Sequence, residues 1–132
     1  MRKNKLFPTW VVLLLVLAII AYRNFRPGNI TEDQVVENES LLVRDPSTLI
    51  FTHHAKCRMN CRRIDSAEVA EILVKGKINA NKSDLANPSD LKYALEGRSA
   101  DNQKIRIIIA PENNGMVVVT VIDLEKDWKC DC

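Results

Sequence analysis

The sequence has few of the residues, and none of the motifs, that mark the common enzyme families. Its 132 residues include four glycines, two histidines and only 5% aromatic residues. It contains no glycine-rich phosphate loop, no Gly-x-Ser-x-Gly elbow and no His-Glu-x-x-His motif. These absences exclude the P-loop nucleotide hydrolases, the serine α/β-hydrolases and the zincin metalloproteases. Any function must therefore rest on residues outside these motifs.

Acidic residues are absent from the start of the chain, so the net charge of the whole chain differs in sign from that of the remaining residues. The whole chain has a formal net charge of +2, but residues 1–26 carry five basic and no acidic side chains. The remaining residues hold 14 basic and 17 acidic side chains, a net charge of −3. Nucleic-acid-binding domains usually have a basic excess. RNA is therefore a disfavoured partner, apart from a local basic cluster at residues 53–63.

Charged residues are also absent from residues 6–22, where residues 10–21 form an unbroken apolar block. A helix over this span is about 25 Å long, slightly short of a ~30 Å hydrocarbon core. A cleaved signal peptide is the alternative, but Ala18 and Ala21 are each paired with a bulky isoleucine at the cleavage spacing. We expect a single-pass membrane protein with its body outside the cytoplasm, because basic residues precede the apolar block. The predicted organisation is a membrane anchor at 1–25, a polar tether at 26–48 and a globular domain at 49–132.

The pattern of the body predicts two helices followed by strands. Thr52 is a suitable N-cap for a helix over 53–63, and Ser66 opens a second helix that ends near Gly76. The predicted fold class is α+β, with an N-terminal transmembrane helix and then two helices on a small three- to four-stranded antiparallel sheet. The predicted strands are an edge strand at 93–97, a strand at 104–110 and a central strand at 116–123, the last two joined by a hairpin loop.

The first predicted helix places cations on one line. His54, Arg58 and Arg62 recur every four residues, so they share a helix face. Guanidinium groups bind phosphate or carboxylate groups in a bidentate manner, and a neighbouring histidine can transfer a proton. Metal-independent RNA cleavage needs this combination, which makes the three residues candidate catalytic residues. The alternative is a solvated face on which the arginines pair with Asp65, Glu68 or a strand carboxylate.

Four cysteines form two sequence pairs, Cys57 with Cys61 and Cys130 with Cys132. Cβ atoms four residues apart on a helix are ~5–6 Å apart, whereas a disulfide needs ~3.5–4.5 Å, so the first pair is not expected to bond internally. We expect the C-terminal tail to dock on the helix. The cysteines then form two disulfides in an oxidising compartment, or a tetrahedral zinc site in a reducing one. His53 is a candidate additional ligand, and no other cofactor is expected.

These elements together resemble the domain-of-unknown-function family 4258, over residues 49–124. That family is similar to RelE- and BrnT-like toxins, which are small bacterial ribonuclease-like folds with helices against an antiparallel sheet. The resemblance implies that His54, Arg58 and Arg62 form the site, with Thr120 facing the cleft. The segments that carry it are His54-Ala55-x-x-Arg58-Met59-x-x-Arg62-x-Ile64, the helix at 67–73, Tyr93-x-Leu95-Glu96-Gly97-Arg98, Ile105-x-Ile107-Ile108-Ile109 and Val117-Val118-Val119-Thr120-Val121.

Two functional hypotheses follow from these observations, and a third is weaker. The favoured hypothesis is a membrane-anchored, disulfide-stapled binding or accessory domain of the cell envelope, which acts through a protein partner. The alternative is a metal-independent ribonuclease-like enzyme of the toxin type that uses His54, Arg58 and Arg62. The third is a small zinc-binding domain built on the four cysteines. The membrane itself is an expected partner, through residues 6–22.

Overall fold

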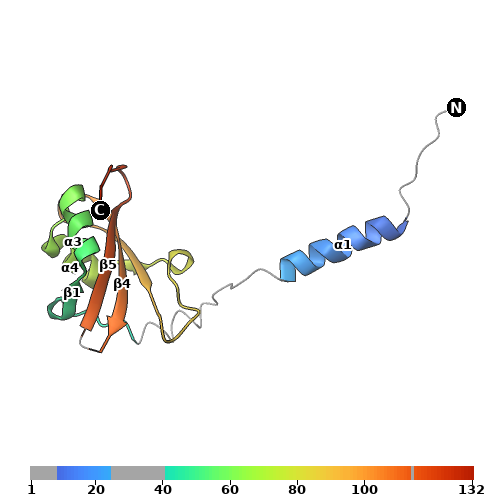
Figure 1. Cartoon of the computed structure of the whole chain (residues 1–132), viewed down its shortest axis with the longest axis horizontal. Helices are drawn as coiled ribbons and strands as arrows, with labels where there is room; N and C mark the ends of the chain where they lie inside the picture. The colour runs from blue at the N-terminus through green and yellow to red at the C-terminus, as the bar shows by residue number, and fades with distance from the viewer. Residues whose placement is uncertain (1–8, 25–40, 114) are drawn as a thin grey trace.

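The structure, a computed structural model, describes residues 9–24, 41–113 and 115–132. Helix α1 stands apart at the N-terminal end, and the other described elements form an α+β body with α3 and α4 on one side of a sheet (Figure 1). The elements in chain order are α1 (Thr9–Asn24), the 3₁₀ turn η1 (Pro46–Thr48), β1 (Leu49–Phe51), α3 (His53–Arg62), α4 (Ser66–Lys75), β2 (Lys77–Ile78), the 3₁₀ turn η2 (Ala80–Lys82), β3 (Tyr93–Arg98), β4 (Lys104–Glu112) and β5 (Gly115–Asp123).

The sheet has five strands in the order β1-β5-β4-β3-β2, and it is mixed. The pairs β2–β3, β3–β4 and β4–β5 are antiparallel, whereas β1 pairs with β5 in parallel. The prediction of a three- to four-stranded antiparallel sheet is therefore wrong. Its error lies in β1 and β2, which have three and two residues and are too short to show a strand periodicity. Strand β5, predicted to be central, is an interior strand between β1 and β4, and the middle strand is β4; β3 lies between β2 and β4 and is not the predicted edge strand.

Alternation along the strands separates a core face of the sheet from an opposite face. On β4, Ile105, Ile107 and Ile109 are fully buried, and on β5 Val118 and Val121 lie in the same core cluster. Apolar side chains of α3 and α4 belong to this cluster, so both helices cover the core face. Burial of each large apolar side chain contributes about 1.5–3 kcal/mol, which makes this layer the main source of stability.

Local signals set the ends of the two helices of the body. Thr52 caps α3 as predicted, because its side-chain oxygen accepts a hydrogen bond from the backbone N–H of Ala55. The helix ends at Arg63, which has the left-handed backbone conformation (φ 57°). At the start of α4, Asp65 and Glu68 form a reciprocal capping box, and α4 ends before Gly76 as expected.

Helix α1 overturns the prediction of a membrane anchor. It has 16 residues, about 24 Å at ~1.5 Å per residue, against a hydrocarbon core of ~30 Å. None of the helices in residues 9–24, 41–113 and 115–132 is both long enough and apolar enough to span a membrane. The predicted transmembrane helix, and the single-pass membrane location deduced from it, are therefore wrong.

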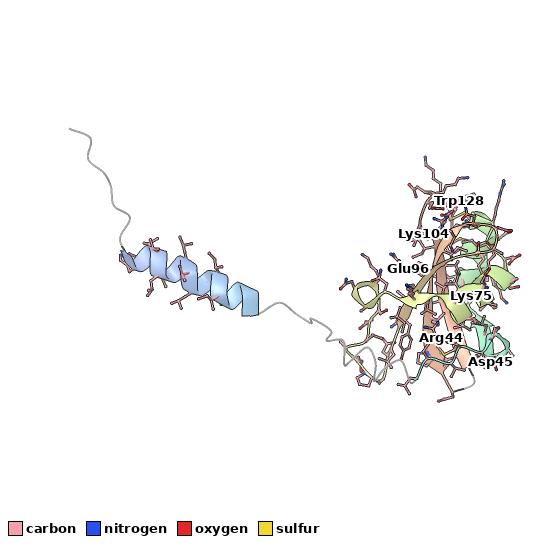
Figure 2. All side chains as sticks on the ribbon, turned by 180° about the vertical axis from the view of Figure 1, so that it is seen from behind. Arg44, Asp45, Lys75, Glu96, Lys104 and Trp128 are labelled. Atoms are coloured by element: carbon pink, nitrogen blue, oxygen red, sulfur yellow. A yellow bond between two sulfur atoms is a disulfide. The ribbon has the colours of Figure 1, made fainter. Side chains whose placement is uncertain are left out.

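Residues just before β1 pack against the body, although the sequence placed them in the tether. Leu42 is buried in the core cluster, and the Arg44 guanidinium donates hydrogen bonds to the carbonyls of Leu73 (2.7 Å) and Gly76 (3.0 Å) at the end of α4. Figure 2 shows Arg44 and Asp45 at one end of the body and Trp128 at the other. Residues 25–40, which make up most of the predicted tether, lie outside the described residues.

Candidate functional site

The candidate site is built on α3, which lies across β5. Ala55 and Met59 point into the core, and these two contacts fix which face of the helix turns outward. The Thr52 N–H and hydroxyl both donate to the carbonyl of Val118 on β5, which ties the start of the helix to the sheet. The helix is therefore held at a defined rotation, so its polar stripes are fixed in direction.

The three cationic residues lie on one line of α3, as the spacing predicted, but in different environments. His54 is exposed, and its Nε2 lies 3.4 Å from the Nε of the half-buried Arg58. Arg62 is also half-buried, and its guanidinium donates a hydrogen bond to the carbonyl of Val121 on β5. The stripe thus runs from an exposed imidazole at one end to an anchored guanidinium at the other.

The two arginines of the stripe lack a direct carboxylate partner among the described residues. Within residues 41–113 and 115–132, neither Arg58 nor Arg62 forms an ion pair with an acidic side chain. Asp65 and Glu68 are instead engaged in the capping box of α4. Partial burial, and then the positive charge of Arg58, lower the pKa of Arg62, while Asp123 and Asp127 act in the opposite direction. The site therefore holds two close guanidinium groups whose mutual repulsion is only partly offset.

The neighbouring stripe of α3 fastens the C-terminal tail by two disulfides. Cys57 bonds to Cys132 and Cys61 bonds to Cys130, with Cα–Cα distances of 5.9 and 5.8 Å. The predicted docking of the tail on the helix is thereby confirmed, and the tail runs antiparallel to α3. All four sulfur atoms are used in these bonds. In this form the described part of the chain has no group of three or more His, Cys, Asp or Glu side chains that could hold a metal.

A buried carboxylate that the sequence did not single out organises the base of the tail. Asp123, at the end of β5, is only 9% exposed. Its Oδ2 accepts hydrogen bonds from Gln103 Nε2 and Trp128 Nε1, both at 2.8 Å, and its Oδ1 accepts from the backbone N–H groups of Glu125 and Lys126. Burial acts to raise the pKa of Asp123, but the four hydrogen bonds, led by that from Trp128, outweigh it and lower the pKa.

A shallow pocket of about 300 Å³ adjoins this cluster. It is lined by Arg62 and by residues 122–128, so it joins the inner end of the cationic stripe to the base of the tail. The Lys126 ammonium lies 3.7 Å from the centre of the Trp128 ring. Strand periodicity in the sequence could not have found Asp123, because the register shift between Ile108 and Ile109 moves the buried positions of β5 from Met116 and Val118 to Val121 and Asp123.

Thr120 is separate from the stripe on α3. It lies opposite Ile108 on the neighbouring strand β4. The residue pairs on either side, Ile109–Val118 and Ile107–Val121, have their side chains buried on the core face of the sheet. The register shift between Ile108 and Ile109 interrupts the alternation between Val118 and Thr120, so Thr120 lies with Ile108 on the sheet face opposite α3. His53 is exposed at the first position of α3. The structure therefore brings together His54, Arg58 and Arg62 but does not add Thr120 to them.

Comparison with known proteins identifies a family without assigning an activity. The family described as a domain of unknown function (DUF4258) matches residues 51–123, which include α3, α4 and strands β2 to β5. Searches of curated proteins and of solved structures found no match, so the resemblance to RelE-like toxins stays a prediction. The matched segment covers more than half of the chain and contains the complete cationic stripe. This protein therefore belongs to the DUF4258 family.

Proposed function

We propose that this chain is a non-catalytic binding domain, in which the cationic stripe of α3 recognises carboxylate groups on a partner protein. The observation that carries the proposal is the pair Arg58 and Arg62, which lie one turn apart without an ion-paired carboxylate in the described residues. A bound anion would relieve their repulsion and accept hydrogen bonds from both guanidinium groups. His54 extends the stripe by one more turn.

The arrangement supports binding better than catalysis. Metal-independent RNA cleavage requires one group to remove a proton and another to donate one. His54 is exposed, and it contacts the Arg58 guanidinium, which does not exchange protons at neutral pH. The hydroxyl proposed to assist it, that of Thr120, lies on the far face of the sheet. The stripe thus offers charge and hydrogen-bond donors, but not a second acid–base group.

The charge distribution favours a carboxylate-bearing protein over RNA. Residues 41–132, which form the body, carry 14 basic and 13 acidic side chains, a net charge of +1, and so lack the basic excess that binding of a polymer with a phosphate at every nucleotide usually requires. A protein partner needs to place only one or two carboxylates on the stripe.

The test compares two anionic probes on the purified full chain with intact disulfides. We would measure fluorescence anisotropy with a short labelled oligoglutamate peptide and with a single-stranded RNA of similar charge. Arg58→Gln should weaken peptide binding about tenfold, equivalent to about 1.4 kcal/mol. Lys82→Gln, which removes an exposed cation from η2, is the matched control and should leave binding unchanged.

Three results would contradict the proposal. The first is an oligoglutamate affinity that is the same in the Arg58→Gln variant and the wild type. The second is equal weakening by Lys82→Gln, which would indicate non-specific attraction. The third is RNA cleavage by the wild type that His54→Ala abolishes, because this outcome would establish the ribonuclease alternative in place of a binding domain.

A further inference from the structure

We propose that the reduced chain binds one Zn²⁺ ion through Cys57, Cys61, Cys130 and Cys132, and that the metal then holds the tail in place of the disulfides. The site lies where the tail crosses the outer stripe of α3. This inference is independent of the carboxylate-binding proposal, because it concerns sulfur atoms that the binding face does not use.

The backbone brings each cysteine of α3 next to a cysteine of the tail, with the two pairs one helical turn apart. The helix supplies two sulfur atoms one turn apart, and the tail supplies two from alternate residues. The Cα atoms of each cross-linked pair are 5.9 and 5.8 Å apart. In a tetrahedral site with Zn–S bonds of ~2.3 Å, the sulfur atoms are about 3.8 Å apart. Small side-chain rotations after reduction would reach this separation without moving α3.

The base of the tail is held by contacts that do not depend on the disulfides. Asp123 accepts hydrogen bonds from Trp128 and from the backbone of residues 125 and 126. Glu125 forms an ion pair with Arg98 at 2.6 Å, and the Leu124 N–H donates to the carbonyl of Lys104 at 2.8 Å. Reduction therefore frees only the last few residues. Cys130 and Cys132 stay within a short tether of the helix, which raises their effective concentration for a shared metal.

The electron and proton balance of the conversion is simple. Each disulfide accepts two electrons and two protons from a dithiol, which itself becomes a disulfide. Zinc then binds the thiolate forms, so the thiol protons are released to solvent on binding. Four thiolates and one Zn²⁺ leave a net charge of −2.

The experiment uses the full chain, reduced without oxygen by a water-soluble phosphine, which becomes phosphine oxide by taking oxygen from water. After addition of Zn²⁺ and gel filtration, we expect one zinc per chain, an unchanged monomer mass and four thiols protected from alkylation. Co²⁺ in place of zinc should give the visible absorption of tetrahedral thiolate coordination. The variant Cys130→Ser with Cys132→Ser should lose the metal, whereas His53→Ala, on the same stripe, should retain it.

Circular dichroism of the reduced chain separates loss of metal from loss of fold. Recovery of the native spectrum on addition of Zn²⁺ would support the proposal even if the metal-free reduced chain unfolds. The proposal is overturned if the folded reduced chain retains no zinc, or if it does not fold with zinc present. It is equally overturned if the double serine variant keeps the metal, if His53→Ala loses it, or if zinc joins two chains.

Discussion

Replacement of Asp123 by asparagine should destabilise the protein more than any other isosteric change in the tail. The carboxylate receives four hydrogen bonds, two at each oxygen, from Gln103, Trp128 and the backbone of Glu125 and Lys126. Asparagine keeps one oxygen but replaces the other by an NH₂ group, which is itself a donor. Whichever way the amide turns, two donors lose their acceptor and face another donor.

The size of the effect follows from these bonds. A hydrogen bond to a charged acceptor contributes about 1.5–3 kcal/mol, so the loss of two bonds corresponds to about 3–6 kcal/mol. Water reaches the edge of the cluster, where the residue is 9% exposed, and replaces part of this energy. We therefore expect the free energy of unfolding to fall by about 2–4 kcal/mol.

The same contribution should depend on pH. The pKa of Asp123 in the folded chain is lowered, chiefly because the hydrogen bonds outweigh the effect of burial. A lowered folded pKa means that the stabilisation is present above the unfolded value of about 3.9 and is lost as the pH falls through the folded pKa. The difference in stability between wild type and Asp123→Asn should therefore be largest near neutral pH and shrink in acid.

Urea unfolding followed by far-ultraviolet circular dichroism, with the disulfides intact, measures this effect. Asp127→Asn makes the same chemical change at an exposed position in the same loop, and it should alter the stability by less than about 0.5 kcal/mol. If Asp123→Asn unfolds at the same urea concentration as this control at neutral pH, then the carboxylate does not organise the base of the tail.

Three further changes test other parts of the fold. Gly115→Ala should cost about 2 kcal/mol or more by urea unfolding, because a Cβ would lie 2.2 Å from the Thr48 carbonyl and φ is +151°; wild-type stability would contradict this. Glu96→Gln should cost about 1 kcal/mol at pH 7 and less in acid. Burial acts to raise the pKa of Glu96, but hydrogen bonds from Arg106 and Asn79 outweigh it and lower the pKa. A stability difference between the variant and the wild type that does not change with pH would refute this explanation. Removal of the Cys57–Cys132 bond by two serines should cost about 2–3 kcal/mol, because the second disulfide still closes nearly the same long loop; a cost as large as removal of both would contradict it.

The helices and the long strands could be predicted because their signals are local. A side-chain cap at Thr52, apolar residues at helical spacing in α4 and the β-branched run of β5 each act within a few residues. The short strands β1 and β2 carried no such signal. Strand β1 exists because it lies beside Met116–Val118 of β5, more than 60 residues away. Its parallel pairing is a property of the assembled sheet.

In the candidate site, too, local features could be predicted from the sequence and contacts between distant segments could not. The four-residue spacing was enough to place His54, Arg58 and Arg62 on one face of a helix, and the distances between Cβ atoms excluded a bond between Cys57 and Cys61. Neither argument identified the Val121 carbonyl that anchors Arg62, because this contact joins segments that are 59 residues apart in the sequence.

The sequence by itself determined the two helices of the body, the long strands and the stripes of α3, because helical periodicity and capping depend on near neighbours. It also predicted that the tail docks on the helix through the cysteines, as two disulfides or as a zinc site. Only the tertiary structure decided that Cys57 pairs with Cys132 and Cys61 with Cys130, and that Thr120 lies on the face away from α3. These results depend on the direction of the tail and the register of β5, which only the packed sheet fixes.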